Sequence, residues 1–144
     1  MLGHLYERQN CSAARALELV GERWSLLILR DAMFRGSTRF SQFQESLGIA
    51  SNVLAKRLES FVDAGLMTRS HGAEHPDYTL TKKGLDLKQV IIALTEWGDR
   101  WITPGPVIFC AGPDGQRVTL ELRSASEEKV AADSVVVRPR RKPR

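Results

Sequence analysis

The fold of this chain is decided by residues 51–65, SNVLAKRLESFVDAG, which have the pattern of an amphipathic helix. Ser51 is a favourable N-cap, because its hydroxyl can accept a hydrogen bond from an amide that the first turn leaves unpaired. Gly65 stands where a left-handed C-cap requires a residue without a Cβ. Apolar residues recur every three or four positions and therefore share one side of the helix. This buried side is predicted to hold Leu54, Leu58, Phe61 and Val62.

The other side of the predicted helix carries side chains that can contact DNA. Asn52 can bond adenine through two atoms, Val53 can meet a thymine methyl group, and Lys56 can reach guanine or a phosphate. An amphipathic helix whose polar side meets only water is the alternative when this stretch is considered alone. The segments on either side of the helix decide between the two interpretations.

A second, shorter helix is predicted immediately upstream, over residues 41–47. Ser41 is suited to cap it, and Gln44 follows three residues later, as in a capping box. Residues 48–50, Gly-Ile-Ala, form a tight connection to the helix that follows. Two short helices joined by about three residues that include a glycine form a helix-turn-helix. We interpret the second of them, residues 51–64, as a DNA recognition helix.

Residues 66–70 and 77–80 are predicted to be the strands of a hairpin, the wing, around the Gly- and Pro-containing loop 71–76. A hairpin beside a recognition helix would bring basic side chains close to the phosphates that flank the groove, and a plain surface hairpin is the alternative. The residues predicted to contact DNA are Arg39, Ser41, Gln42, Ser51, Asn52, Val53, Lys56, Arg57, Arg69, His71 and His75.

Two helices are predicted before this motif. Residues 12–20 should form a helix with Ser12 as its cap and Gly21 at its end. Residues 24–34 are so rich in Leu, Ile and Trp that the helix they form should be buried nearly all round and lie at the centre of the core. Residues 38–40 can supply a short strand.

A long last helix is predicted from Lys82 to about Trp101, after Thr81 as its cap. It carries more apolar surface than one side of a small domain can cover, so we expect a subunit interface shared with the first helix. The alternative is packing against the C-terminal segment of the same chain. The residues predicted to form a homodimer interface are Leu17, Val20, Leu87, Val90, Ile91, Leu94, Trp97 and Trp101.

The composition changes near residue 104. Residues 107–110 and 117–123 should form a small β-hairpin, and residues 134–137 can add a third strand. The basic end of the chain could contact DNA phosphates or act only as a solubilising terminus. The predicted fold is α+β, mainly α, with a winged helix-turn-helix and dimerisation domain at residues 1–103, a β-hairpin appendage at 104–137 and a disordered basic tail at 138–144.

The overall charge favours an anionic partner only modestly, because 21 basic residues oppose 17 acidic ones for a net charge of +4. Cys11 and Cys110 form neither a disulfide framework nor a Cys-x-x-Cys pair, as expected in a reducing compartment. No apolar run is long enough to span a bilayer, and residues 1–8 lack the apolar core of a signal peptide. We therefore expect a cytoplasmic protein without membrane contact.

An enzyme is the alternative from another functional class, and its catalytic groups would have to come from three histidines and two cysteines. His71 and His75 lie in a predicted turn without a Cys pair, no Gly-rich phosphate loop follows a strand, and Cys110 has no base near it in sequence. We expect neither catalysis nor a metal or other cofactor. A winged helix that binds proteins instead of DNA is a second alternative, and the basic residues of the predicted docking surface argue against it.

Several sequence blocks in a fixed order resemble the HxlR-type branch of the winged helix-turn-helix regulators related to MarR, over roughly residues 8–101. The resemblance implies a homodimeric bacterial transcription factor that binds a pseudo-palindromic operator in double-stranded DNA, with the first and last helices as its dimer interface. Ser12 replaces the Pro that commonly follows the Cys, and Asn52 stands where Pro often opens the recognition helix. The blocks are Cys11, ALELVGERWSLLILR (16–30), RFSQF (39–43), VLAKRL (53–58), GLMTR (65–69) and YTLTKKG (78–84).

Some HxlR-type proteins use such an N-terminal Cys to sense oxidants or electrophiles, so the resemblance also implies an oxidant or an unidentified small molecule as effector. A helix start and the nearby Arg8 and Arg15 would favour the thiolate of Cys11. A Cys in a dimer-forming segment is more commonly a small, buried apolar residue, which is the interpretation we favour. We therefore expect the protein to keep its affinity for DNA under mild oxidant.

Overall fold

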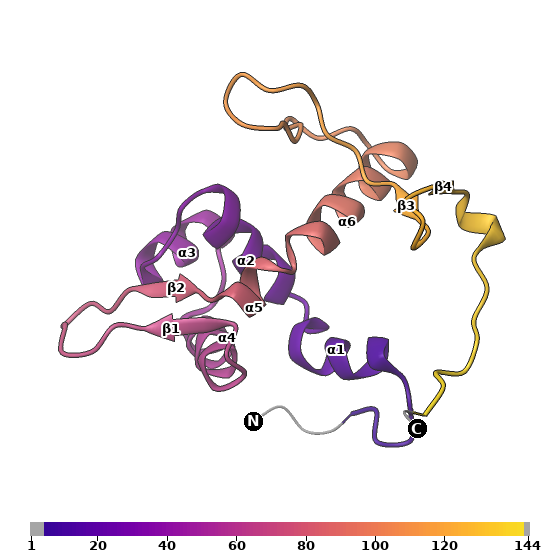
Figure 1. Cartoon of the computed structure of the whole chain (residues 1–144). Helices are drawn as coiled ribbons and strands as arrows, with labels where there is room; N and C mark the ends of the chain where they lie inside the picture. The colour runs from indigo at the N-terminus through magenta and orange to yellow at the C-terminus, as the bar shows by residue number, and fades with distance from the viewer. Residues whose placement is uncertain (1–4, 143–144) are drawn as a thin grey trace. The chain divides into compact units, whose positions relative to one another are not determined.

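The computed structural model describes residues 5–142 and has the mainly helical α+β architecture predicted from the sequence (Figure 1). The chain falls into a first unit, Met1–Ile91, and a second unit, Ile92–Arg144. The elements are α1 (Ser12–Val20), α2 (Ser25–Phe34), α3 (Phe40–Leu47), α4 (Ser51–Asp63), β1 (Met67–Arg69), β2 (Tyr78–Leu80), α5 (Lys82–Leu85), α6 (Lys88–Trp101), β3 (Leu122–Arg123), β4 (Lys129–Val130) and the 3-10 helix η1 (Ala132–Ser134).

The core of the first unit forms where α2, α3 and α4 pack together. Of the α4 face predicted to be buried, Leu54, Leu58 and Phe61 are buried as expected, and Val62 is only partly buried. The expectation that α2 is buried nearly all round is wrong, because Leu27 is 37% exposed and Phe34 is 42% exposed. The completely buried apolar residues include Ile28, Leu29, Phe43, Leu54 and Leu58.

The helix starts differ from the predicted ones by one or two residues. The N-cap of α3 is Arg39 and not Ser41. The capping-box side chain is Gln42 and not Gln44, and its Oε1 accepts from the amide of Arg39 at 3.0 Å. α4 begins at Ser51 with Ala50 as N-cap, so the Ser51 hydroxyl does not cap the helix. Likewise α1 has Cys11 as its N-cap instead of Ser12.

Two glycines end the helices of the motif. Gly48 after α3 has φ of 63° and Gly65 after α4 has φ of 74°, both in the left-handed region that favours glycine. The predicted role of Gly65 is therefore confirmed. The carbonyl groups at this end of α4 are also bonded by side chains, since Lys83 Nζ donates to Ala64 O at 2.6 Å and Thr81 Oγ1 donates to Gly65 O at 2.5 Å.

The predicted wing is confirmed with shorter strands. β1 and β2 are antiparallel, with Met67 opposite Leu80 and Arg69 opposite Tyr78. Residues 38–40 do not form the predicted strand, because α3 already begins at Phe40. What remains is an isolated bridge between Arg39 and Asp77.

The predicted long last helix is interrupted. Thr81 caps α5 as expected, its hydroxyl accepting from the amide of Gly84 at 3.2 Å. α5 ends at Leu85, and α6 begins only at Lys88. A Cβ on Gly84 would collide with the carbonyl of Leu66, so this glycine permits the close approach of α5 to the segment between α4 and β1.

The residues predicted to form a dimer interface divide into two groups. Val20, 7% exposed, and Ile91, 4% exposed, belong to the core of the first unit, so their assignment to an interface is corrected. Leu87 is half-buried against the same core. The others are exposed as an interface requires: Leu17, Val90, Leu94, Trp97 and Trp101.

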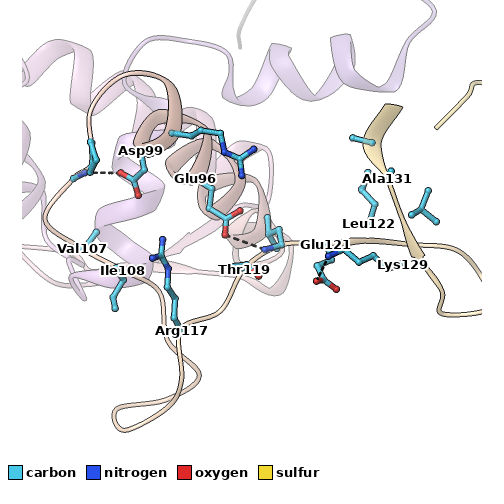
Figure 2. A pocket seen from close by; sticks show the side chains of 16 residues that line it. Glu96, Asp99, Val107, Ile108, Arg117, Thr119, Glu121, Leu122, Lys129 and Ala131 are labelled. Atoms are coloured by element: carbon cyan, nitrogen blue, oxygen red, sulfur yellow. Dashed lines mark hydrogen bonds and ion pairs between the residues drawn. The ribbon is translucent and has the colours of Figure 1, made fainter. Parts of the chain in front are cut away.

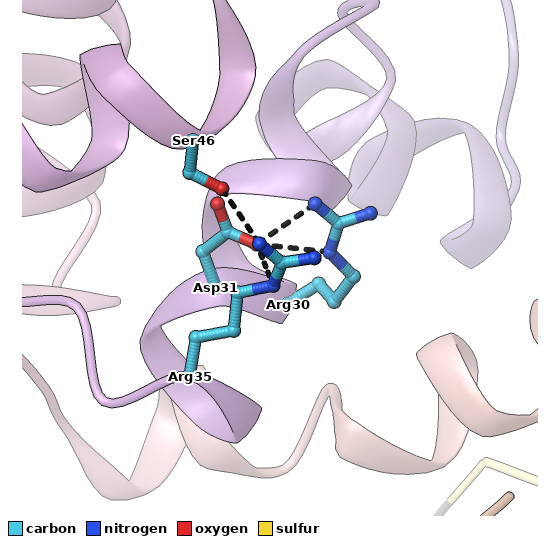
Figure 3. Close-up of polar contacts among 4 residues, drawn as sticks. All are labelled: Arg30, Asp31, Arg35 and Ser46. Atoms are coloured by element: carbon cyan, nitrogen blue, oxygen red, sulfur yellow. Dashed lines mark hydrogen bonds and ion pairs between the residues drawn. The ribbon is translucent and has the colours of Figure 1, made fainter. Parts of the chain in front are cut away.

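A buried carboxylate connects α2 with α3 (Figure 3). The side chain of Asp31 is completely buried, and its Oδ1 accepts from Nε and Nη2 of Arg30 at 2.9 and 2.8 Å. Arg35 lies beside the same oxygen at 3.6 Å and donates from Nη1 to the hydroxyl of Ser46 on α3 at 3.2 Å. This polar cluster holds the first helix of the motif against α2.

The second unit has less regular structure than the sequence predicts. Residues 107–110 and 117–123 share only an isolated bridge between Cys110 and Arg117. The last two residues of 117–123 form the strand β3, which pairs with β4 further along the chain. Residues 134–137 form no strand. Of the predicted basic tail, residues 138–142 have no secondary structure, and 143–144 lie outside the described residues. No helix within 5–142 has the length and apolar character that crossing a membrane requires.

Candidate nucleic-acid interface

The helix α4 divides sharply into a buried and an exposed side. Leu54 and Leu58 are 0% exposed. Ser51, Asn52 and Lys56 are exposed in the first half of the helix. Because the apolar side is fully occupied by the core, the exposed polar side is free to enter a groove of DNA.

Ser51 has a structural partner that its exposure does not reveal. Gln44 Nε2 on α3 donates to Ser51 Oγ, which joins the two helices of the motif across their connection. Gln44 was predicted to bond within its own helix, whereas it fixes the start of α4. The Ser51 hydroxyl therefore helps to hold the neighbouring Asn52 in position.

Arg57 does not belong to the exposed side, which corrects its assignment to the DNA-binding surface. It is 7% exposed, and its Nε lies 3.8 Å from Glu22 Oε2. Its Nη1 has no hydrogen-bond partner among residues 5–142. Glu22 also accepts from the amide of Trp24 at 3.0 Å, so Arg57 connects α4 to the segment between α1 and α2.

Val53 is half-buried and packs against the core, so little of its side chain is available to a thymine methyl group. Its position lies between the two sides of α4. Asn52 and Lys56 are therefore the predicted base-contacting residues that the structure leaves fully accessible.

The predicted contacts from α3 have separate roles. Gln42 Oε1 accepts from the amides of Thr38 and Arg39, so its oxygen is engaged at the start of the helix. Arg39 Nε lies 3.6 Å from Asp77 Oδ1, which connects α3 to the wing. Ser41 is exposed on the first turn. Ser41 and the guanidinium of Arg39, which is half-exposed, remain accessible to a phosphate.

The wing exposes its basic residues. The guanidinium of Arg69 lies 6.0 Å from the ring centre of Tyr78 on the opposite strand, a cation–π contact that orients it. His71 and His75 are exposed in the loop between the strands. Ser70 Oγ accepts from the amide of Asp77 at 2.8 Å and closes the base of this loop.

A hollow of about 840 Å³ lies between the second half of α4 and the wing. Glu59 and Asp63 line it together with Arg69 and Tyr78. His71 lines it as well, so acidic side chains of α4 and basic or protonatable side chains of the wing share this hollow. Away from it, the exposed predicted residues include Ser51, Asn52 and Lys56 of α4 and Ser41 of α3.

A second hollow, of about 860 Å³, lies within the second unit (Figure 2). Two of its carboxylates are already engaged by the backbone: Glu96 accepts from the amide of Leu120 at 3.3 Å, and Asp99 accepts from the amide of Gly105 at 2.8 Å. These bonds hold the appendage to α6. Among residues 5–142 there is no group of three or more His, Cys, Asp or Glu side chains that could hold a metal ion.

Cys11 is exposed. The favoured interpretation, that it is a small, buried apolar residue, therefore does not hold for the single chain that the structure describes. The backbone amide of Ala14, followed by that of Ala13, lowers the pKa of the Cys11 thiol, and the charge of Arg15 adds to the effect. The start of a helix has this effect on thiols because its unpaired amides stabilise the thiolate. The structure thus presents an accessible cysteine whose thiol pKa is lowered.

Sequence reasoning missed the residues that position α4. Glu22, Gln44 and Lys83 each hold this helix through one ion pair or hydrogen bond. Glu22 and Lys83 are far from their partners in sequence, so no local spacing could indicate these contacts. Gln44, seven residues before Ser51, was the one partner close enough in sequence to be considered from local spacing.

Comparison with known proteins agrees with this geometry. The model of the HxlR-like helix-turn-helix family matches residues 19–106. The HTH-type transcriptional regulator Rv3095 of Mycobacterium tuberculosis is 46% identical over 104 residues, which make up 70% of this chain and 64% of that protein. The chain therefore spans less than two thirds of the length of this relative.

Two solved structures extend the comparison to the fold. PA1607, described as a transcription factor, is 36% identical with a TM-score of 0.80, and the match covers 91% of this chain and 96% of that one. The transcriptional regulator YodB of B. subtilis in its reduced form is 31% identical with a TM-score of 0.55, covering 67% and 99%. YodB also has a quinone-bound structure, which is 30% identical with a TM-score of 0.54, covering 63% and 99%. With more than half of its length matched by the family model, this chain belongs to the HxlR-like helix-turn-helix family of transcriptional regulators.

Proposed function

We propose that this protein regulates transcription as a homodimer that binds a pseudo-palindromic operator, with α4 of each protomer in the major groove of one half-site. The observation that carries the proposal is the division of α4. Its apolar side is fully buried, whereas Asn52 and Lys56, one turn apart, are exposed in its first half. Asn pairs with adenine and Lys with guanine or phosphate in the major groove.

The wing supports the same mode of binding. Arg69 is oriented by Tyr78, and His71 and His75 are exposed in the loop. Contacts from such residues to phosphates would fix the position of the protein on the duplex without reading its sequence. A wing in this role would make binding by every protomer sensitive to salt.

Dimerisation is supported by the exposed apolar side of α6. Leu94, Trp97 and Trp101 are 53%, 57% and 69% exposed and follow the spacing of one helix face, with Val90 one turn earlier. Burying large apolar side chains contributes about 1.5–3 kcal/mol each. A stripe of this kind therefore supports an interface with a second copy of the chain.

The experiment that tests the proposal is selection of bound duplexes from a random DNA library by the purified protein. We expect a consensus made of two inverted half-sites, with centres about 10–10.5 base pairs apart or a multiple of that distance. A library that shows no enrichment would favour the alternative, a winged helix that binds proteins.

A second candidate function, sensing of oxidants or electrophiles through Cys11, has an observation of its own. The thiol is exposed and its pKa is lowered by the amides of Ala14 and Ala13. The structure of YodB, which is 30% identical to this chain, has been solved with a bound quinone. We propose that modification of Cys11 would alter the affinity of the dimer for its operator.

Gel shifts with and without diamide, on the wild type and on Cys11→Ser, test this second function. Release of the wild type alone would support sensing, and equal binding by both would support the simple regulator. Because the pKa of Cys11 is lowered, its thiolate should persist below the ordinary thiol range, and its alkylation should slow only as pH falls through the lowered pKa. The Cys11→Ser variant, in which the exposed Cys110 remains, is the control for the alkylation rate.

A further inference from the structure

The positive charge of this chain is concentrated at its C-terminal end. Residues 138–144 contain five of the 21 basic residues and none of the 17 acidic residues. The remaining residues, 1–137, therefore hold 16 basic and 17 acidic side chains and have no positive excess. The net positive charge of the protein thus comes from these seven residues, which we call the basic tail.

The described part of the basic tail is available to a partner. Residues 138–142 are exposed and have no secondary structure. Their four basic side chains have no ion-pair partner in the part of the chain that the structure describes. Pro139 disfavours a helix and an inner strand, so the tail is suited to an extended conformation.

We propose that the basic tail binds the phosphates of DNA next to the operator and supplies a large part of the salt-dependent, sequence-independent affinity. This inference rests on the proposed function. An extended polyproline-type segment advances about 3.1 Å per residue and leaves its side chains in solvent. The long, flexible side chains of Arg140, Arg141 and Lys142 can therefore each reach a phosphate of the densely charged duplex.

The other anionic surface within reach of the basic tail is its own second unit, where residues 92–137 hold seven acidic and four basic side chains. Two of those carboxylates lie on α6 and five on the appendage, and several already have partners. Glu121 pairs with Lys129 at 3.2 Å, and Glu96 and Asp99 accept from backbone amides. DNA carries one charge per about 1.7 Å of its axis and releases counterions on binding, so it is the favoured partner.

The test uses the full chain with Arg138, Arg140, Arg141 and Lys142 all replaced by Gln. Its affinity for random duplex DNA is measured from 50 to 300 mM salt beside the wild type. Each lost phosphate contact lowers the salt slope by about 0.9, so we expect a decrease of about 2–3.6 per protomer. A control in which the three arginines become Lys keeps the charge and should keep the slope.

An unchanged slope in the Gln variant would overturn the proposal. A second readout identifies the partner directly, with a photo-crosslinking amino acid in place of Val137, which is 97% exposed. We expect crosslinks to DNA, and crosslinks only to the appendage would contradict the proposal. The proposed function is tested separately by the wild type alone. If it is wrong, the wild type will not prefer operator over random DNA, whereas the difference in salt slope between the wild type and the Gln variant will be unaffected.

Discussion

Lys56 and Arg57 are neighbours of like charge with opposite environments. Lys56 is exposed, whereas Arg57 is buried and lies beside Glu22. The helical spacing indicated this, because Arg57 is three residues after Leu54 and four before Phe61, on the apolar side. Its charge nevertheless favoured a surface assignment. Glu22, the carboxylate that pairs with the buried guanidinium of Arg57, is 35 residues away in sequence and could not be identified from local spacing.

This pair of residues gives a first prediction. Arg57→Ala should destabilise the fold by about 3 kcal/mol, the lower end of the range for removing one partner of a buried ion pair, because Glu22 keeps some contact with solvent. Lys56→Ala should change stability by less than about 0.5 kcal/mol, as for other surface substitutions. Urea denaturation of both variants measures the difference. Equal stability of the two would show that Arg57 is not held in the core.

At the scale of elements, the winged helix-turn-helix was predictable because each of its parts has a local signal. The spacing of apolar residues predicted the buried side of α4, and Gly65 predicted where the helix ends. The exact caps were missed because Ser41 and Ser51 are good N-caps at positions where the chain has already turned into the helix. At the start of α3 the local contact between Gln42 and the amide of Arg39 takes the place of the expected cap.

The second unit was predicted less well for a physical reason. Its strands β3 and β4 have two residues each, too few for a period of two to appear in the sequence. Residues 134–137 have strong β propensity but remain exposed, and propensity without burial does not make a strand. The close approach of Gly84 to Leu66 was not predictable from local sequence, because only the folded chain brings these residues together.

The end of α4 provides a second prediction. Gly65→Ala should destabilise the protein by about 1–2 kcal/mol, because an L-residue with a Cβ is strained in the left-handed region at φ of 74°. Gly65→Asn should cost less, since Asn adopts this conformation more easily. Thermal melts of the two variants give the comparison. The conformational argument fails if Asn is as costly as Ala.

At the scale of the whole molecule, the exposed apolar stripe on α6 supports the proposed homodimer. Our third prediction is that the protein is a dimer at micromolar concentration and that Leu94→Asp converts it to a monomer, because a carboxylate cannot be buried in an apolar interface without a large cost. Gln89→Asp, exposed on the same helix but off the stripe, should remain dimeric. Light scattering measures the mass. A monomeric wild type would remove the basis for two half-sites.

The central claim, that the exposed side of α4 reads DNA, is tested most directly by the affinities of Asn52→Ala and Lys56→Ala for the selected operator and for random DNA. Each should lose about 1–3 kcal/mol of discrimination while its thermal melt is unchanged. Leu58→Ala is the matched control, because it should lose about 2–5 kcal/mol of stability and keep its selectivity while folded. If Asn52→Ala and Lys56→Ala both bind the operator with wild-type affinity and selectivity, α4 is not the helix that reads DNA.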